Sequence, residues 1–250
     1  MPQVIAGLIL AAAAAAVARL GGLLTIGGAL TAVVIGTAVF AGGGWGLALT
    51  LFAAFWLTGV VTVYRRGEKI QPEHRRGRSA SQVLANGLIP AGLAVAYVAF
   101  DLPWAITGAM GAIAASAADT LATEIGLLSP SLPRLITTGQ RVARERSGGI
   151  TAVGTISGVG GAIFVGLFGL EQGWAPVAVG GIAGMVIDSL LGATAQARYR
   201  CPSCGEEGES RECACGGARM PAGGIAWMTN DAVNLLMAAA GAAVAALLAS

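Results

Sequence analysis

Long apolar stretches separated by short polar segments dominate this chain. Eight of them are expected to be membrane-spanning helices, at residues 4–18, 23–41, 45–64, 81–100, 103–128, 150–170, 174–196 and 223–249. Each span needs about 17 to 25 residues to cross the hydrocarbon core. The first stretch is short and rich in alanine, so a count of seven stays open. Because no positive segment precedes it, we interpret it as a retained helix rather than a cleaved signal peptide.

The composition supports this assignment. Hydrophobic residues make up 55% of the 250 residues and charged residues only 11%, whereas soluble domains average about 25% charged residues. The 39 glycines suit close helix contacts in lipid, where small residues let backbones approach each other. We therefore predict an all-α polytopic bundle forming one transmembrane domain over residues 1–250. A cysteine-rich loop at 197–222 is inserted between the last two spans.

All fifteen lysines and arginines fall on one side of the eight-span arrangement, after the first, third, fifth and seventh spans. The positive-inside rule places this side in the cytoplasm and both termini outside. These cations have two interpretations. They either fix topology and meet anionic lipid headgroups, or some of them bind phosphate, as arginine clusters do.

The loop after the fifth span favours phosphate binding. Arg141 and Arg144 are followed by Ser147, Gly148 and Gly149, which offer a hydroxyl group and unhindered backbone amides. A glycine-rich turn that runs into a helix N-terminus forms an anion site. We expect this turn to open the sixth span in that way.

Four carboxylates lie in or at the ends of stretches that otherwise look lipid-buried: Asp119, Glu124, Asp188 and Asp231. An ionised side chain near the bilayer centre costs several kcal/mol, so such acids are functional candidates. Structural alternatives exist for three of them. Glu124 could pair with an arginine, Asp188 could be a protonated or serine-bonded acid, and Asp231 could complement a helix N-terminus.

Asn230 and Asn234 accompany Asp231 on neighbouring helix faces, which exceeds what one helix cap requires. Carboxylates facing phosphate-binding arginines would repel a nucleotide unless a divalent cation lay between them. We therefore expect Mg²⁺, held by Asp119, Asp188 and Asp231. This combination favours phosphoryl or nucleotidyl transfer, and ion or proton transport is the competing class, because membrane acids also build proton relays.

The four cysteines predict a structural zinc site. They form two close pairs, Cys201 with Cys204 and Cys213 with Cys215, on the expected cytoplasmic side, where disulfides are uncommon. Four thiolates with turn-forming glycines fit tetrahedral Zn²⁺. Redox-active thiols and a reduced hairpin are the alternatives.

Several motifs resemble the integral membrane family first catalogued as domain of unknown function 92. They lie at 77–87, 117–126, 133–149, 188–193 and 230–234 and cover nearly the whole chain. The family includes plant phytyl-phosphate kinase, which makes phytyl diphosphate, and is distantly similar to CTP-dependent polyprenol kinases and CDP-lipid synthases. The resemblance implicates Asn86, Asp119, Glu124, Arg141, Asp188, Asn230, Asp231 and Asn234. The cysteine-rich insertion is absent from the plant enzyme.

These arguments predict a membrane-embedded isoprenoid-phosphate kinase that uses CTP or another nucleoside triphosphate. Arg141, Arg144 and the turn 147–149 would hold the nucleotide phosphates, with the active site facing the cytoplasm of a cell membrane. The alternatives are a cytidylyltransferase that makes a CDP-lipid and a cation or proton transporter. The expected partners are the bilayer, a prenyl or phytyl monophosphate and a nucleotide. No nucleic acid is expected, and a homo-oligomer stays open.

Overall fold

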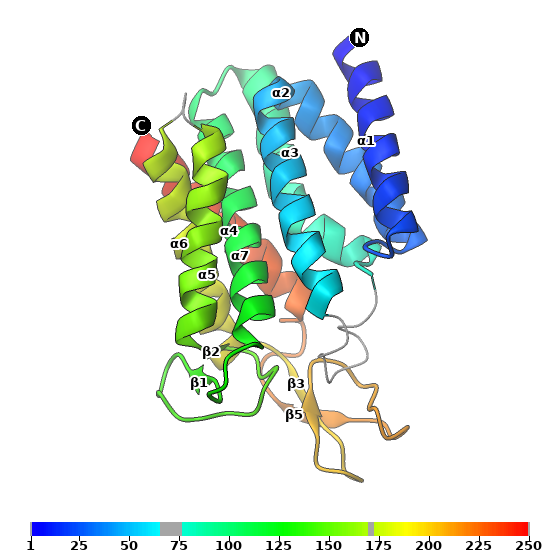
Figure 1. Ribbon diagram of the computed structural model, residues 1–250, viewed down its shortest axis with the longest axis vertical. Coiled ribbons are helices and arrows are strands. Elements are labelled where there is room, and N and C mark those ends of the chain that lie inside the picture. Colours follow the sequence, from blue (N-terminus) through cyan, green and yellow to red (C-terminus); the bar gives the residue numbers. More distant parts are fainter. Residues whose placement is uncertain (1, 66–76, 170–172, 250) are drawn as a thin grey trace.

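The computed structural model describes residues 2–65, 77–169 and 173–249. Seven helices in these ranges are long and apolar enough to span a membrane. They are α1 (Pro2–Leu20), α2 (Ile26–Arg65), α3 (Ala80–Phe100), α4 (Trp104–Gly126), α5 (Ala152–Gly166), α6 (Trp174–Thr194) and α7 (Asn230–Ala249). They form one bundle, with both termini at one end and the strands at the other (Figure 1). The expected helical class is confirmed.

Helix α2 contains the second and third expected spans in one element. At Gly44 the backbone leaves helical geometry, with φ 61° and ψ −156°, a conformation that glycine adopts readily. A Cβ atom added to Gly59 would lie 3.0 Å from the Leu23 side chain. Since Leu23 precedes the start of α2, the second half of α2 runs back past the first. The count of about eight crossings stays a prediction, because one continuous element carries two of the expected spans.

Helix α4 is the centre of the bundle. Its residues from Ala105 to Ala115 are buried without interruption, as expected for a helix that is apolar on all sides. Neighbouring helices approach it closely through small residues. A Cβ atom added to Gly181 of α6 would lie 2.8 Å from that of Ala114, and one added to Gly241 of α7 would lie 2.8 Å from that of Ala115. The acids further along α4 therefore face protein.

Short strands and loops cover one end of the bundle. Strands β1 (Arg134–Leu135) and β2 (Gly149–Ile150) pair antiparallel. Strands β3 (Arg198–Arg200), β4 (Glu207–Gly208) and β5 (Met220–Gly223) form a sheet in the order β4-β3-β5. The 3₁₀ turn η3 (Leu167–Gly169) follows α5. The described residues just before α3 and the loops after α4 and α6 thus gather at the same end, as the charge pattern predicted (Figure 1). Residues 66–76, which belong to the basic segment after the third expected span, lie outside the described residues.

The expected last span begins too early. Residue 223 was expected to start a helix, but it ends β5, and α7 begins at Asn230. Gly223 and Gly224 have positive φ angles, which a right-handed helix excludes. The hydroxyl oxygen of Thr229 accepts a hydrogen bond from the Ala232 amide at 3.3 Å. Thr229 thus caps the helix.

Candidate functional site

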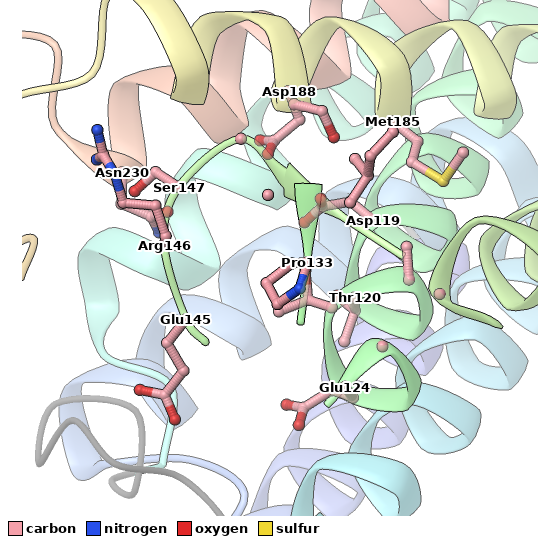
Figure 2. Close-up of a pocket in the computed structure, with 18 of the residues that line it drawn as sticks. Asp119, Thr120, Glu124, Pro133, Glu145, Arg146, Ser147, Met185, Asp188 and Asn230 are labelled. Carbon is pink, nitrogen blue, oxygen red and sulfur yellow. The ribbon is translucent and has the colours of Figure 1, made fainter. Parts of the chain in front are cut away.

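Acids and arginines from separate parts of the chain meet in one cavity at the strand end of the bundle (Figure 2). Its volume is about 410 Å³, within the range of about 300–1,000 Å³ for small-molecule sites. Five acids and three arginines line it: Asp119, Glu124, Glu145, Asp188, Glu209, Arg78, Arg144 and Arg146. With all of them ionised, the lining carries two negative charges in excess. The cavity therefore offers ligands both for a cation and for an anion.

Asp119 on α4 and Asp188 on α6 are two acids of the cavity wall in direct contact. Their carboxyl groups share a side-chain hydrogen bond, and Figure 2 shows them directed into the same part of the cavity. Two ionised carboxylates do not remain in contact unless a proton or a cation lies between them. The pair therefore fits the oxygen-rich ligand set that Mg²⁺ prefers. The sequence predicted both residues, and the fold brings them together.

Arg78 is the cation that sequence reasoning undervalued, because it was counted only as one of the loop cations. Its Nη2 donates to Thr120 Oγ1 at 3.3 Å. Burial lowers the pKa of Arg78, and the nearby charges of Glu124 and Asp119 oppose that effect. Since guanidinium groups stay protonated in proteins, Arg78 brings a fixed positive charge beside two acids of the cavity.

The backbone of Arg78 is held firmly in place. Its amide donates to the Leu23 carbonyl at 2.8 Å, and its carbonyl accepts from the Thr25 amide at 3.1 Å. The next residue, Ser79, forms a capping box with Gln82 at the start of α3. The segment before α2 therefore positions the guanidinium group of Arg78. These backbone contacts join residues more than fifty positions apart, which sequence spacing does not reveal.

Arg144 holds the loop after α4 against that helix. It donates from Nη1 to the Leu127 carbonyl at 2.7 Å and from Nη2 to the Ser129 carbonyl at 2.9 Å. Carbonyls just beyond a helix C-terminus lack partners within the helix, so Arg144 satisfies them. It also lines the cavity. Its predicted contact with nucleotide phosphates stays a prediction.

The glycine turn does not lead directly into a helix, which corrects the sequence expectation. Gly149 lies in β2, and α5 begins only at Ala152, with Thr151 as its N-cap. The Gly149 amide donates to the Arg146 carbonyl at 2.9 Å. Strand pairing with β1 thus replaces the expected helix start. Gly148, with φ 76°, packs on α6, where a Cβ atom would collide with the backbone of Ala193.

The cysteine-rich loop also reaches the cavity. Ser147 Oγ donates to Glu209 Oε1 at 2.7 Å, and both residues line the cavity. Arg146 Nε lies 3.7 Å from Glu207 Oε2. Burial lowers the pKa of Arg146, and a hydrogen bond from Arg200 lowers the pKa of Glu207. Glu145 and Glu209 were missed by sequence reasoning, since only the path of these loops brings them to the site.

Two predicted site residues do not line the cavity. Arg141 is exposed, and its backbone pairs with that of Arg134 in a single antiparallel β-bridge. Asp231 lies in the first turn of α7, whereas Asn230 and Asn234 of the same turns do line the cavity, as does Asn86 of α3. Helix α7 therefore presents the side-chain amides of Asn230 and Asn234 to the site, rather than the carboxylate of Asp231.

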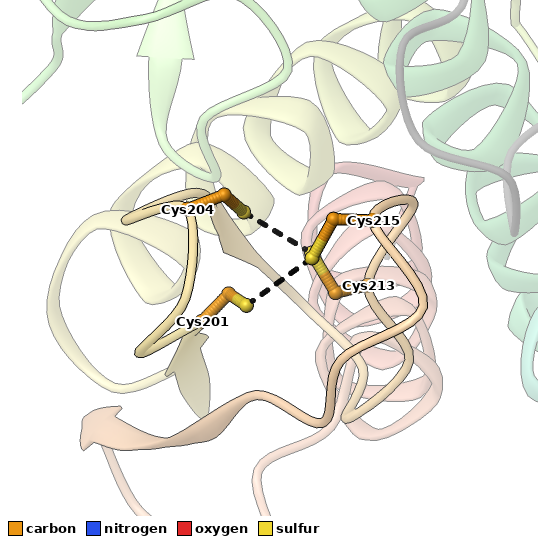
Figure 3. A group of neighbouring side chains, drawn as sticks. All are labelled: Cys201, Cys204, Cys213 and Cys215. Atoms are coloured by element: carbon orange, nitrogen blue, oxygen red, sulfur yellow. Dashed lines mark hydrogen bonds between the residues drawn. The ribbon is translucent and has the colours of Figure 1, made fainter.

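The four cysteines form a compact thiol cluster (Figure 3). Their Sγ atoms all lie within 4.8 Å of one another, with Cys201–Cys215 and Cys204–Cys213 separations of 3.5 Å. A disulfide would need about 2.05 Å, whereas tetrahedral Zn²⁺ with bonds of about 2.3 Å spaces its sulfur ligands about 3.8 Å apart. A backbone hydrogen bond from Cys204 lowers the pKa of Cys201 to about 6, which favours the metal-binding thiolate.

Comparison with known proteins places these motifs in a family. The chain matches the model of the integral membrane protein family DUF92 over residues 9–242. It belongs to the DUF92 family. The resemblance inferred from the motifs is thereby confirmed. The expectation of an integral membrane protein with transmembrane helices is confirmed as well. No solved structure matches the DUF92 chain.

The chain is similar to proteins from three organisms, and it spans less than two thirds of the length of two of these proteins. An uncharacterized membrane protein of Methanocaldococcus jannaschii is 42% identical over 153 residues, which cover 58% of this chain and 63% of that protein. An uncharacterized membrane protein of Synechocystis is 27% identical over 238 residues, or 89% of this chain and 81% of that protein. Protein PGR of Arabidopsis thaliana is 36% identical over 108 residues, or 36% of this chain and 38% of that protein.

Proposed function

We propose that this DUF92 protein is a membrane-embedded isoprenoid-phosphate kinase. It would transfer a phosphoryl group from CTP or another nucleoside triphosphate to a prenyl or phytyl monophosphate. The observation that carries the proposal is the cavity in which the Asp119–Asp188 pair and Arg78 meet at one end of an apolar bundle. A lipid phosphate can reach such a site from the bilayer, and a nucleotide can reach it from the aqueous side.

The residues around the cavity have separate roles in this proposal. Asp119 and Asp188 would hold Mg²⁺, which supplies positive charge to the phosphate oxygens. Arg78 and Arg146, both in the cavity wall, bind phosphate oxygens. Asn86, Asn230 and Asn234 add polar groups to the same wall. The predicted contributions of Arg141 and Asp231 stay predictions, because neither residue lines the cavity.

The transfer step follows from these roles. An oxygen of the acceptor monophosphate attacks the γ-phosphorus of the nucleotide, the bond to the β–γ bridging oxygen breaks, and the nucleoside diphosphate leaves with that electron pair. A phosphate monoester is largely deprotonated near pH 7, so the acceptor needs no strong general base. The arginines offset charge that accumulates on the phosphoryl oxygens.

The thiol cluster is proposed to bind one structural Zn²⁺. Its four sulfur atoms match a closed tetrahedral site, in which no position is left for a substrate. The cluster then keeps the loop in the shape that presents Glu209 to the cavity. It takes no part in the transfer step.

The products of one incubation test the proposal against its alternatives. Purified protein in lipid nanodiscs is supplied with Mg²⁺, a prenyl monophosphate and CTP labelled on either the α- or the γ-phosphate. We expect the γ-label in a lipid diphosphate, with CDP released. The α-label in the lipid, with pyrophosphate released, would identify a cytidylyltransferase instead. Absence of any labelled lipid, together with ion flux in sealed vesicles, would overturn the kinase proposal in favour of transport.

A further inference from the structure

A second cavity lies beside the polar one and is almost wholly apolar. Its volume is about 350 Å³, and its walls come from α1, both halves of α2, α3 and α4. The second half of α2 contributes Trp45, Ala48, Leu49, Phe52, Phe55 and Trp56. Spacings of three and four residues place these side chains on one helix face. We call this cavity the apolar groove.

The apolar groove joins the polar cavity. Arg78 and Asn86 line both cavities. Ser116 lies in the apolar groove one helical turn before Asp119 of the polar cavity. A ligand with a charged head and an apolar tail could therefore occupy both cavities at once, with its head at the arginine and its tail along the aromatic wall.

The dimensions and openings of the groove suit a single hydrocarbon chain. From Thr58 to Trp45 the lining follows α2 for 13 residues, or about 20 Å at 1.5 Å per residue. Phe40 and Trp45 pack edge to face at the far end, with ring centroids 4.9 Å apart. Phe52, which lies within this apolar stretch of α2, is 51% exposed. A chain can thus enter sideways from the bilayer, and the ring pair limits how far it extends.

We propose that the apolar groove binds the prenyl chain of the acceptor, with the acceptor phosphate held at Arg78 and Asn86, and that its length selects the chain length. This inference rests on the proposed kinase function, and it names the part of the site that recognises the lipid. The guanidinium of Arg78 matches a phosphate monoester in charge and geometry. A single chain fills one groove, whereas a two-chain phospholipid would leave its second chain outside.

Chain-length selectivity tests the proposal, with neighbouring alanines of α1 as a matched pair. Ala14 lines the groove about two thirds of the way along α1, and Ala13 is exposed and does not line it. Ala14→Phe should leave kcat/KM for geranyl phosphate within twofold and lower it at least tenfold for geranylgeranyl phosphate. Ala13→Phe should change neither value. An unaltered length profile in Ala14→Phe would overturn the proposal while leaving the kinase assignment intact.

Photoaffinity labelling provides a readout that needs neither turnover nor a folded variant. A farnesyl phosphate analogue with a diazirine at the tail end is irradiated with wild-type protein in nanodiscs. We expect labelled peptides from the second half of α2, and protection by excess farnesyl phosphate but not by phosphatidic acid. Equal protection by phosphatidic acid, or labels elsewhere, would reject the groove as a prenyl site. Specific labelling without phosphoryl transfer would reject the kinase and retain the groove.

Discussion

Replacing Asp188 with asparagine is expected to stabilise the metal-free protein and to lower the rate of transfer strongly. Two unit charges about 4 Å apart interact with about 4 kcal/mol at an effective dielectric constant of about 20. Asp119 and Asp188 are in hydrogen-bonding contact, and a shared proton removes part of this repulsion. We therefore expect Asp188→Asn to gain about 1–3 kcal/mol without metal. For a chain of this size, that gain corresponds to about 2–4 °C per kcal/mol.

Magnesium should reverse the order of stability. A ligand at about 100 times its dissociation constant stabilises the folded state by about 2.7 kcal/mol, and only the wild type has the complete carboxylate pair. Unfolding is followed by tryptophan fluorescence in detergent, with chelator and then with rising Mg²⁺. The wild-type Tm should start below that of Asp188→Asn and rise above it, while transfer by the variant is lower by about 10² or more.

A matched control removes a carboxylate far from the cavity. Asp101 ends α3 in a left-handed conformation with φ 51°, which asparagine also tolerates. Asp101→Asn should keep both the transfer activity and the Mg²⁺-dependent rise in Tm. If Asp188→Asn shows the same rise with Mg²⁺ as the wild type, the pair is not the metal site and the mechanism fails.

Three further predictions concern other parts of the molecule. Arg78→Gln should raise KM for the acceptor by about 10- to 100-fold, because a charge-assisted hydrogen bond contributes about 1.5–3 kcal/mol. The exposed Arg134→Gln is its charge-matched control, and equal KM values in the two variants would refute the role of Arg78. Introduced cysteines in the loops 129–149 and 197–222 should be labelled only from the cytoplasmic face, and labelling of either loop from outside would reverse the orientation. Purified protein should contain about one Zn²⁺ per chain, and Cys201→Ser should lower that content, so full metal loading in the variant would exclude the site.

Much of the bundle could be predicted because the bilayer leaves few choices. Backbone groups in lipid must be bonded within the segment, so apolar runs of sufficient length become helices. The buried acids were equally constrained. Asp119 and Asp188 interrupt apolar helices that lie side by side, and the cost of exposing them to hydrocarbon predicts that they face protein. The structure places both in one cavity, with Glu124 in the same wall.

The sequence could not supply the contacts that join distant segments. The segment before α7 is apolar enough to resemble a helix, yet β5 pairs with β3, which follows α6. Pairing with a distant strand thus outweighs the local preference of this segment for a helix. Arg78 likewise depends on backbone bonds to Leu23 and Thr25. The sequence also could not show that Asp231 does not line the cavity, because helical spacing fixes which residues share a face, but not how that face is turned toward the site.

In the proposed function, the cysteine-rich loop would connect zinc binding to the candidate active site without placing a thiol there. None of the four cysteines, all within the described ranges, is among the residues that line the polar cavity. Instead, Glu209 follows β4 and accepts the hydrogen bond of Ser147, while Glu207 of β4 faces Arg146. Loss of the metal would release β4 and withdraw Glu209, the acid that accepts the hydrogen bond of Ser147, from the cavity wall. Transfer activity should therefore fall in parallel with zinc content, although the cluster touches neither substrate.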